Sequence, residues 1–303
     1  MPHRPAPPIL AVTLALLGLV FSLVLLVAAV GYAAPISAPQ PLDACRTSPQ
    51  FLAAFNATPD MALATDGTAM GLVLRSSTGD YQLPSWDDAG YLGPLAYDRR
   101  GDVYVAPTPR LSLADNPLAG AATIWRVDSA SGLMHPFTTL SGAANARNPF
   151  GILGLAYACD LDTLYAGTVL GSTPSSEHGG VVAIGLADQN QQVVLPNTDV
   201  MSVLVLRHGG GYTLYAGLAR RPLVLALPLD AHGQPRGPAQ PLIDLSQAGA
   251  TPQERARKLR LVGEQLQIDL VPFTYSLQAN ATDTPQIRTL TWQWDAVHGV
   301  WVR

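Results

Sequence analysis

The sequence is short of charge, of lysine and of cysteine, and these shortages narrow the classes of protein that it can encode. Charged residues make up 13% of the 303 residues, and Lys258 is the sole lysine. The formal net charge is −4, so the chain lacks the clustered basic face that binding to nucleic acid requires. We therefore expect no nucleic-acid partner.

Sequence signatures of catalysis are also missing. The chain contains no G-x-S-x-G elbow, no P-loop and no dinucleotide-binding glycine motif. His135, His208, His232 and His298 fall in or near predicted hairpin turns and share no spacing suited to zinc. The sequence thus favours a protein without catalytic activity, with a metal-dependent hydrolase as the enzymatic alternative.

Long apolar runs are confined to the N-terminus. Residues 9–30, ILAVTLALLGLVFSLVLLVAAV, carry no charge, and a helix over them would be roughly 33 Å long, enough to cross a hydrocarbon core of about 30 Å. The apolar core of a cleaved signal peptide is shorter, about 7–15 residues. The run predicts a transmembrane signal-anchor over 9–30 after a cytoplasmic tail over 1–8. The alternative is a secreted protein whose N-terminal segment is cleaved.

The distribution of positive charge predicts the orientation of this span. Arg4 precedes it, and the next positive residue is Arg46. By the positive-inside rule the N-terminus stays in the cytoplasm. We expect a single-pass protein of the cell membrane with an extracytoplasmic C-terminal domain.

Residues 31–49 read as a proline-rich stalk. The part from Pro35 to Ala44, PISAPQPLDA, has no apolar periodicity and favours polyproline II, at about 3.1 Å per residue. Leu42 to Cys45 resembles a bacterial lipobox, but the stalk separates this motif from the apolar run. A lipid would also be redundant beside a spanning helix.

The remainder of the chain, residues 50–303, repeats one pattern. An inner hairpin such as GPLAYDRRGDVYVAP, residues 93–107, is followed after a variable gap by an outer hairpin such as TIWRVDSASGLMHPF, residues 123–137. The unit recurs about every 40 to 60 residues, which is typical of propeller blades. We predict an all-β propeller of five four-stranded blades, preceded by the single transmembrane helix.

Five repeats can be delimited from this pattern. They run over residues 50–86, 93–140, 151–195, 201–245 and 257–303. The first is the least regular, as terminal repeats usually are. A sixth blade, hidden in that irregular segment, is the alternative to five.

The two cysteines, Cys45 and Cys159, are a candidate disulfide. An oxidising exterior permits the bond, which would be worth about 4 to 5 kcal/mol for so long a loop. However, Cys159 ends the first strand of the third repeat, which in a ring does not neighbour the first. Cα atoms more than about 7 Å apart cannot be bridged, so a bonded and a free pair are both open.

The segments GPLAYDRRGDVYVAP and GLAYACDLDTLYAG resemble the strand-turn-strand units of the NHL and SMP-30 (gluconolactonase-like) propellers. The resemblance covers most of residues 50–303 and implies the propeller fold. In the lactonase-type members a glutamate opens the first blade, and Asn and Asp side chains complete a metal site in the channel. This sequence has no glutamate at the matching place.

Strand alternation predicts that the long loops crowd onto one face around the channel mouth, and binding sites usually lie on such loops. The candidate binding residues there are Asp88, Arg147, Asn148, Asp199 and Glu254, with Glu177 and His178 on a glycine-rich loop. Oxygens of Asp88, Asn148 and Asp199 could hold calcium or another divalent cation. Alternatively, they satisfy turn backbone groups. Glu177 and His178 are either an acid-base or ligand pair or a solvated loop tip.

The pattern as a whole predicts a membrane-anchored, extracytoplasmic binding module. Its loop-rich face would take a protein or a small-molecule ligand. The alternative is a metal-dependent lactonase or hydrolase of the SMP-30-like type, which rests on fold analogy.

Overall fold

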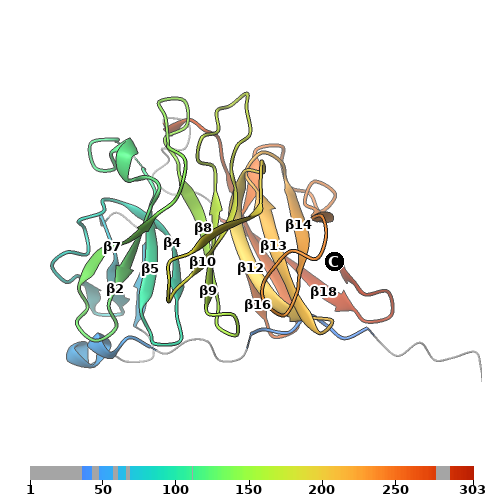
Figure 1. Ribbon diagram of the computed structural model, residues 1–303, viewed down its shortest axis with the longest axis horizontal. Coiled ribbons are helices and arrows are strands. Elements are labelled where there is room, and N and C mark those ends of the chain that lie inside the picture. The colour runs from blue at the N-terminus through green and yellow to red at the C-terminus, as the bar shows by residue number, and fades with distance from the viewer. Residues whose placement is uncertain (1–35, 43–47, 57–60, 66–68, 111, 278–286) are drawn as a thin grey trace, which may run out of the picture.

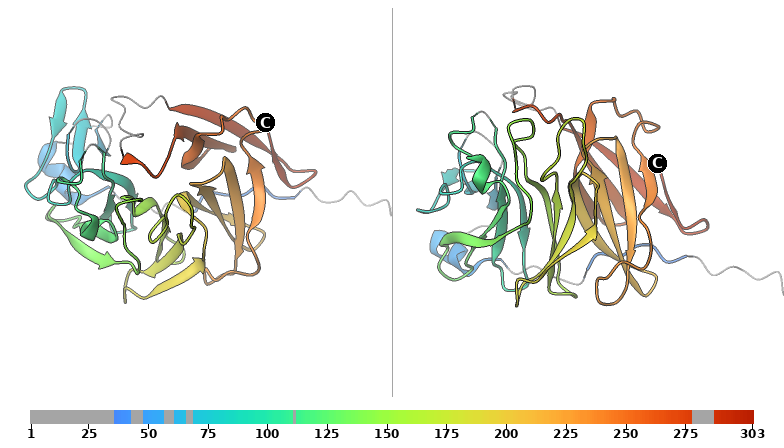
Figure 2. Two further views of the ribbon diagram at one scale, coloured as in Figure 1. Left: turned by 90° about the horizontal axis from the view of Figure 1, so that it is seen from above. Right: turned by 45° about the horizontal axis from the view of Figure 1, so that its top comes forward.

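Alternating apolar residues form nineteen strands in five antiparallel sheets within the described part of the chain. The computed structural model describes residues 36–42, 48–56, 61–65, 69–110, 112–277 and 287–303. The sheets are the blades of a five-bladed β-propeller (Figure 1), arranged around a common centre when seen from above (Figure 2). The predicted all-β propeller is therefore confirmed, with five blades and no sixth sheet among these residues.

Each blade takes its strands in chain order. Blades one and two consist of β1 (Ala62–Ala64), β2 (Val73–Ser76) and β3 (Gly79–Tyr81), then β4 (Leu92–Tyr97), β5 (Val103–Pro107), β6 (Thr123–Val127) and β7 (Met134–Thr139). Blade three consists of β8 (Ile152–Ala158), β9 (Thr163–Thr168), β10 (Gly180–Gly185) and β11 (Gln191–Leu195). Blades four and five consist of β12 (Val200–His208), β13 (Gly211–Leu218), β14 (Leu223–Leu229) and β15 (Gln240–Asp244), then β16 (Glu254–Val262), β17 (Gln265–Pro272), β18 (Arg288–Asp295) and β19 (Val300–Val302).

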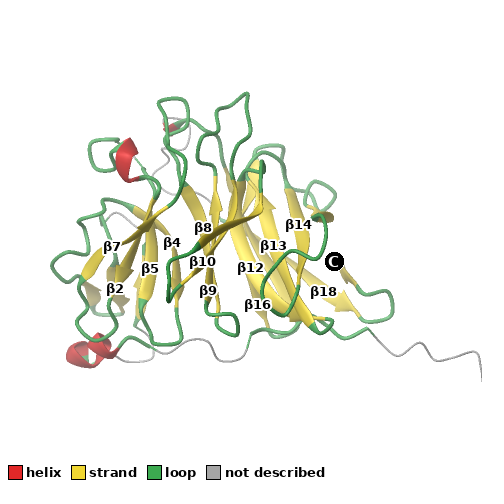
Figure 3. Ribbon diagram, in the orientation of Figure 1, coloured by secondary structure: helices red, strands yellow, loops and turns green. Residues whose placement is uncertain are grey.

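Blade one departs from the prediction of four strands, because three are found among its described residues. The tight turn between β2 and β3 corresponds to the outer hairpins of the other blades, so β1 takes the place of a second strand. The segment predicted as the first strand forms the short 3-10 helix η1 (Gln50–Phe55), which lies at the end of the propeller that carries the hairpin turns (Figure 3) and donates the Phe51 N–H to the Ser129 carbonyl of the β6–β7 turn. Phe51 of η1 packs edge-on against Trp86, with ring centroids 5.6 Å apart. QFLAAF is apolar on successive residues, without the alternation that a strand requires.

Hydrophobic clusters join each blade to the next. Separate clusters join blades one and two, two and three, three and four, and four and five. Strand side chains alternate between two faces, so a blade with neighbours on both sides is apolar on both. Among the described residues, no cluster joins β1–β3 to β16–β19.

The predicted stalk, residues 31–49, is described over 36–42 and 48–49, and the first of these stretches lies against the propeller. The Ile36 N–H donates to the Ala296 carbonyl at 2.8 Å, and Gln40 exchanges two backbone hydrogen bonds with Arg207. Leu42 packs against the clusters of blades two to four. These contacts hold residues 36–42 on the propeller.

Cys159, at the end of blade three's first hairpin strand, is disulfide-bonded. The chain's other cysteine, Cys45, lies outside the described residues. Leu42, three residues before it, packs against the cluster that includes Cys159. The N-terminal segment therefore reaches blade three directly, a route that the order of the repeats did not reveal.

The two ends of the propeller differ in their loops. The tight turns within hairpins lie at one end, and the links between second and third strands lie at the other, including the loop that carries the 3-10 helix η2 (Leu118–Gly120) (Figure 1). We call the second end the loop face. The predicted span over 9–30 lies outside the described residues, and the described residues contain no helix long and apolar enough to cross a membrane.

Candidate binding site at the channel mouth

An apolar cluster, which we call the mouth cluster, lies at the loop-face ends of the strands of blades three, four and five. Its members come from blades three, four and five: Phe150, Leu153, Val169, Met201, Ala219, Val271 and Phe273. The ring centroids of Phe150 and Phe273 lie 5.3 Å apart, and those of Phe273 and Tyr275 lie 5.5 Å apart. The chain after β17 thus crosses from blade five onto the starts of blades three and four.

Asp199 lies beneath this cluster and is fully buried. Its Oδ1 accepts hydrogen bonds from the Ser172 hydroxyl at 2.5 Å and from the Gly179 N–H at 2.9 Å. Its Oδ2 accepts from the Arg220 Nε at 2.7 Å and from the Tyr275 hydroxyl at 2.5 Å. Four donors from three blades therefore satisfy this one carboxylate, as a buried charge requires.

Arg220 extends the network across the loop face. Its guanidinium lies over the ring of Tyr275, 5.0 Å from the centroid, and it also donates to the carbonyls of Thr173 and Ser176. Burial and the hydrogen bond to Asp199 raise the pKa of Tyr275 well above its usual value. Tyr275 therefore stays protonated and acts as a donor to the carboxylate.

Two of the other predicted site residues join this network. The Glu177 Oε1 accepts from the Asp199 N–H at 2.7 Å and lies 3.8 Å from the Arg220 Nε. The His178 N–H donates to the Ser172 hydroxyl at 2.9 Å. Ser172 accepts a second N–H from Gly179 while donating to Asp199, so this hydroxyl links the loop backbone to the buried carboxylate.

The remaining predicted residues lie elsewhere on the loop face. Asn148 is fully buried and uses its amide on backbone groups, donating to the Val169 carbonyl at 2.7 Å and accepting from the Phe150 N–H. Glu254 pairs with Arg288 at 2.6 Å, and hydrogen bonds from this guanidinium lower the pKa of the carboxyl. Asp88 and Arg147 are exposed on links between blades.

The three predicted metal ligands, Asp88, Asn148 and Asp199, lie on three different links between blades. Within the described ranges, no group of three or more His, Cys, Asp or Glu side chains is placed to hold a metal ion. The Asp199 and Asn148 side chains instead satisfy loop and backbone groups. This is the turn-satisfying role that the sequence left as the alternative.

Sequence reasoning missed Ser172, Arg220 and Tyr275. Arg220 stands in the short link Arg220-Arg221-Pro222, and Tyr275 follows Phe273 after a strand. An arginine and two aromatics on loop-face links were the available signal, since such residues dominate binding surfaces. Their convergence on Asp199 depends on how blades three, four and five stack.

Comparisons with known proteins give distant structural similarities alone. No protein family matches the sequence, and neither does any curated protein. Among solved structures, the chain is similar to one from a nidogen/laminin complex, with a TM-score of 0.44, 10% identity, and coverage of 72% of this chain and 71% of that one. A luciferin-regenerating enzyme has a TM-score of 0.45 at 11% identity, covering 77% and 69%. The major Malassezia sympodialis allergen Mala s 1 has a TM-score of 0.40 at 16% identity, covering 65% and 54%.

Proposed function

We propose that the protein is a binding module whose loop face, around the mouth cluster, contacts a protein or small-molecule ligand. The observation that carries this proposal is the Asp199 network. It holds Tyr275 and Arg220 of two different blades rigidly against one another on the loop face. Aromatic and arginine side chains on a fixed support are the usual anchors of binding surfaces.

The N-terminus supplies the second part of the proposal, an extracytoplasmic location. The uncharged run over 9–30 supports a membrane anchor, and a disulfide-bonded Cys159 fits an oxidising compartment. We expect the full-length protein to stay in the membrane pellet after carbonate extraction. A variant lacking residues 1–30 should appear in the soluble fraction, and an unchanged distribution would remove the anchor.

Site-specific photo-crosslinking in membranes of the producing organism tests the binding face. Crosslinkers replace the exposed Arg221 or Ser276 on the loop face, and Leu133 or Val297 on turns at the opposite end. We expect defined adducts from the loop-face pair and none from the other pair. Adducts from Leu133 or Val297 alone would contradict the proposal, because they would place the binding surface at the end that carries the hairpin turns.

No observation on the described residues favours the hydrolase alternative. Elemental analysis of the purified full-length protein still tests it directly. A stoichiometric divalent metal that is lost in Asp88→Ala would support a metal site on the loop face. A folded protein without bound metal would contradict the metal-dependent hydrolase and leave the binding module as the proposed function.

A further inference from the structure

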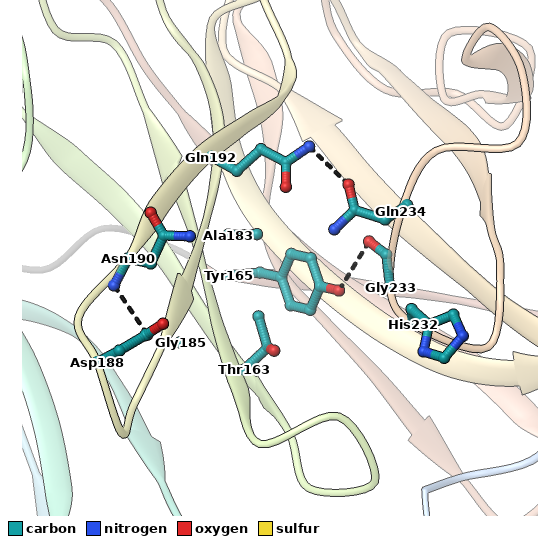
Figure 4. A pocket seen from close by; sticks show the side chains of 10 residues that line it. All are labelled: Thr163, Tyr165, Ala183, Gly185, Asp188, Asn190, Gln192, His232, Gly233 and Gln234. Atoms are coloured by element: carbon teal, nitrogen blue, oxygen red, sulfur yellow. Dashed lines mark hydrogen bonds between the residues drawn. The ribbon is translucent and has the colours of Figure 1, made fainter.

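A small hollow of about 130 Å³ lies between blades three and four, at the end that carries the hairpin turns. Figure 4 shows the side chains around it. It is lined by Thr163, Tyr165, Ala183, Gly185, Asp188, Asn190, Gln192, His232, Gly233 and Gln234. None of these residues belongs to the loop-face network.

The hollow arises from small residues in the third strand of blade three. Tyr165, Ala183 and Gln192 pair across β9, β10 and β11, and Gly185 pairs with Thr163 in the next row. Paired residues share one face of a sheet. Because Ala183 and Gly185 have small side chains or none, the middle strand leaves space between the larger side chains of the flanking strands.

Blade four carries the same row, but there it is filled. Tyr215, Ala226 and Gln240 pair across β13, β14 and β15. Trp301 of blade five packs in the same cluster as Tyr215 and donates its indole N–H to the tyrosine hydroxyl at 3.4 Å. The packing between blades four and five therefore covers a row that remains hollow between blades three and four.

A turn of blade four walls the hollow instead of filling it. The Tyr165 hydroxyl donates to the Gly233 carbonyl at 3.3 Å, and the Gln192 amide donates to Gln234 at 2.6 Å. Gly233 has a φ of +77°, and a Cβ there would lie 2.5 Å from the Tyr165 hydroxyl. Only glycine allows this close approach of the turn to Tyr165, and the backbone carbonyl of Gly233 then holds the turn at the edge of the hollow.

The lining determines the ligand chemistry. It offers the carboxamides of Asn190, Gln192 and Gln234 and the hydroxyl of Thr163, each able to donate or accept hydrogen bonds. It contains no lysine or arginine to bind an anion, and its one carboxylate, Asp188, and one imidazole, His232, are too few ligands for a divalent cation. Its volume equals about four waters at roughly 30 Å³ each, which admits one edge of a single sugar ring and leaves the rest of the ring in solvent.

We propose that this hollow binds a neutral sugar residue, either a free monosaccharide or the terminal residue of a glycan. Sugar hydroxyls donate and accept, as the carboxamides do, so each can exchange partners with the Gln192–Gln234 pair. The site lies at the opposite end from the proposed binding face. A failure of sugar binding therefore leaves the proposed function of the loop face untouched, and a failure of binding at the loop face leaves this proposal untouched.

Titration of the full-length protein, followed by saturation-transfer NMR, tests the site. The protein is held in a detergent without a sugar headgroup, and the probes are glucose, galactose, mannose and N-acetylglucosamine, each alone. We expect saturable binding of at least one sugar. A terminal-residue preference would appear as tighter binding of a disaccharide ending in that sugar. Absence of saturation with all four sugars, or competition by inorganic phosphate or calcium, would overturn the proposal.

Variants place the binding in this hollow. Ala183→Leu fills it, and Gln192→Ala removes an exposed carboxamide without touching the core. Each should weaken sugar binding tenfold or more. Gln240→Ala, at the same register position in blade four, should leave the affinity unchanged. If Ala183→Leu fails to fold, Gln192→Ala decides, and equal affinity in Gln192→Ala and Gln240→Ala contradicts the assignment.

Discussion

Asp199 links three blades through a single carboxylate. Ser172 and Gly179 of blade three, Arg220 of blade four and Tyr275 of blade five all donate to it. Burying a charge costs several kcal/mol unless partners offset that cost, and here every lone-pair direction has a donor. The residue therefore holds three blades together, and its removal leaves the Arg220 Nε and the Tyr275 hydroxyl without the acceptor that they share.

Replacing Asp199 with alanine should destabilise the protein by about 3 kcal/mol, the usual result of breaking a buried ion pair. The free energy of unfolding from urea titration measures this loss. Asp88→Ala is the matched control, since Asp88 is an exposed loop-face aspartate and should change stability by less than about 0.5 kcal/mol. Equal effects of the two substitutions would refute the bracing role.

Glu254 gives a pH dependence of known sign. Hydrogen bonds from Arg288 hold the pKa of this carboxyl below its ordinary 4.5. The stabilisation is therefore present above pH 4.5 and is lost as the pH falls below it. Arg288 is 42% exposed, so the contribution is small, about 0.5–1 kcal/mol.

The urea midpoint of Glu254→Gln should lie below that of the wild type at pH 6, and the gap should close by pH 3. Glu264→Gln, on an exposed hairpin turn, should follow the wild type throughout. A gap that stays constant with pH would show that the carboxylate charge is not responsible.

At the scale of elements, the repeated Tyr-Ala-Gly at the ends of β9 and β13 has a packing cause. A Cβ at Gly167 would lie 2.8 Å from the Val200 Cγ1. One at Gly217 would lie 2.3 Å from the Ser202 Oγ of its own blade and 2.7 Å from the Ala256 Cβ. Val200 and Ala256 belong to the first strand of the following blade. Glycine at these positions lets the second strand of one blade approach the next blade closely.

Gly217→Ala should therefore cost about 1–3 kcal/mol by overpacking the interface between blades four and five. Gly120 is the control, because a Cβ there would meet no atom within 4 Å. Gly120→Ala should be neutral or stabilise by up to about 1 kcal/mol, by restricting the unfolded chain. Differential scanning calorimetry on both variants compares the two costs, and a neutral Gly217→Ala would contradict this account.

The sequence predicted the hairpins because their signals are local. Apolar alternation and turn residues such as Gly101 lie within one hairpin, so blades two to five were placed correctly. The prediction of four strands for blade one was wrong for its described residues, because the segment predicted as the first strand lacks alternation and forms η1. Asp199 and Glu177 were found as polar loop residues, whereas Tyr275, 76 residues from Asp199 in sequence, joins them only through the stacking of blades.

At the scale of the whole molecule, stability is passed from each blade to the next. Each of the four clusters between blades draws its apolar side chains from two consecutive blades. Blade three, residues 151–195, contributes to two clusters, whereas blade one contributes to one among the described residues. In an array stabilised by contacts between neighbours, removing an internal unit removes two stabilising interfaces, whereas removing a terminal unit removes one.

Deleting residues 151–195 should therefore abolish soluble folding, because it exposes the apolar faces of blades two and four, which do not match one another. It also removes Cys159 and the Ser172 and Gly179 donors to Asp199. Deleting residues 48–90 exposes one face, and we expect a destabilised but partly soluble protein. Soluble yield and the cooperativity of thermal melting, measured for both deletions against the full-length chain, separate the two cases. A cooperative melt for the blade-three deletion would contradict this account, because it would show that the two clusters of blade three are not required for the remaining blades to fold.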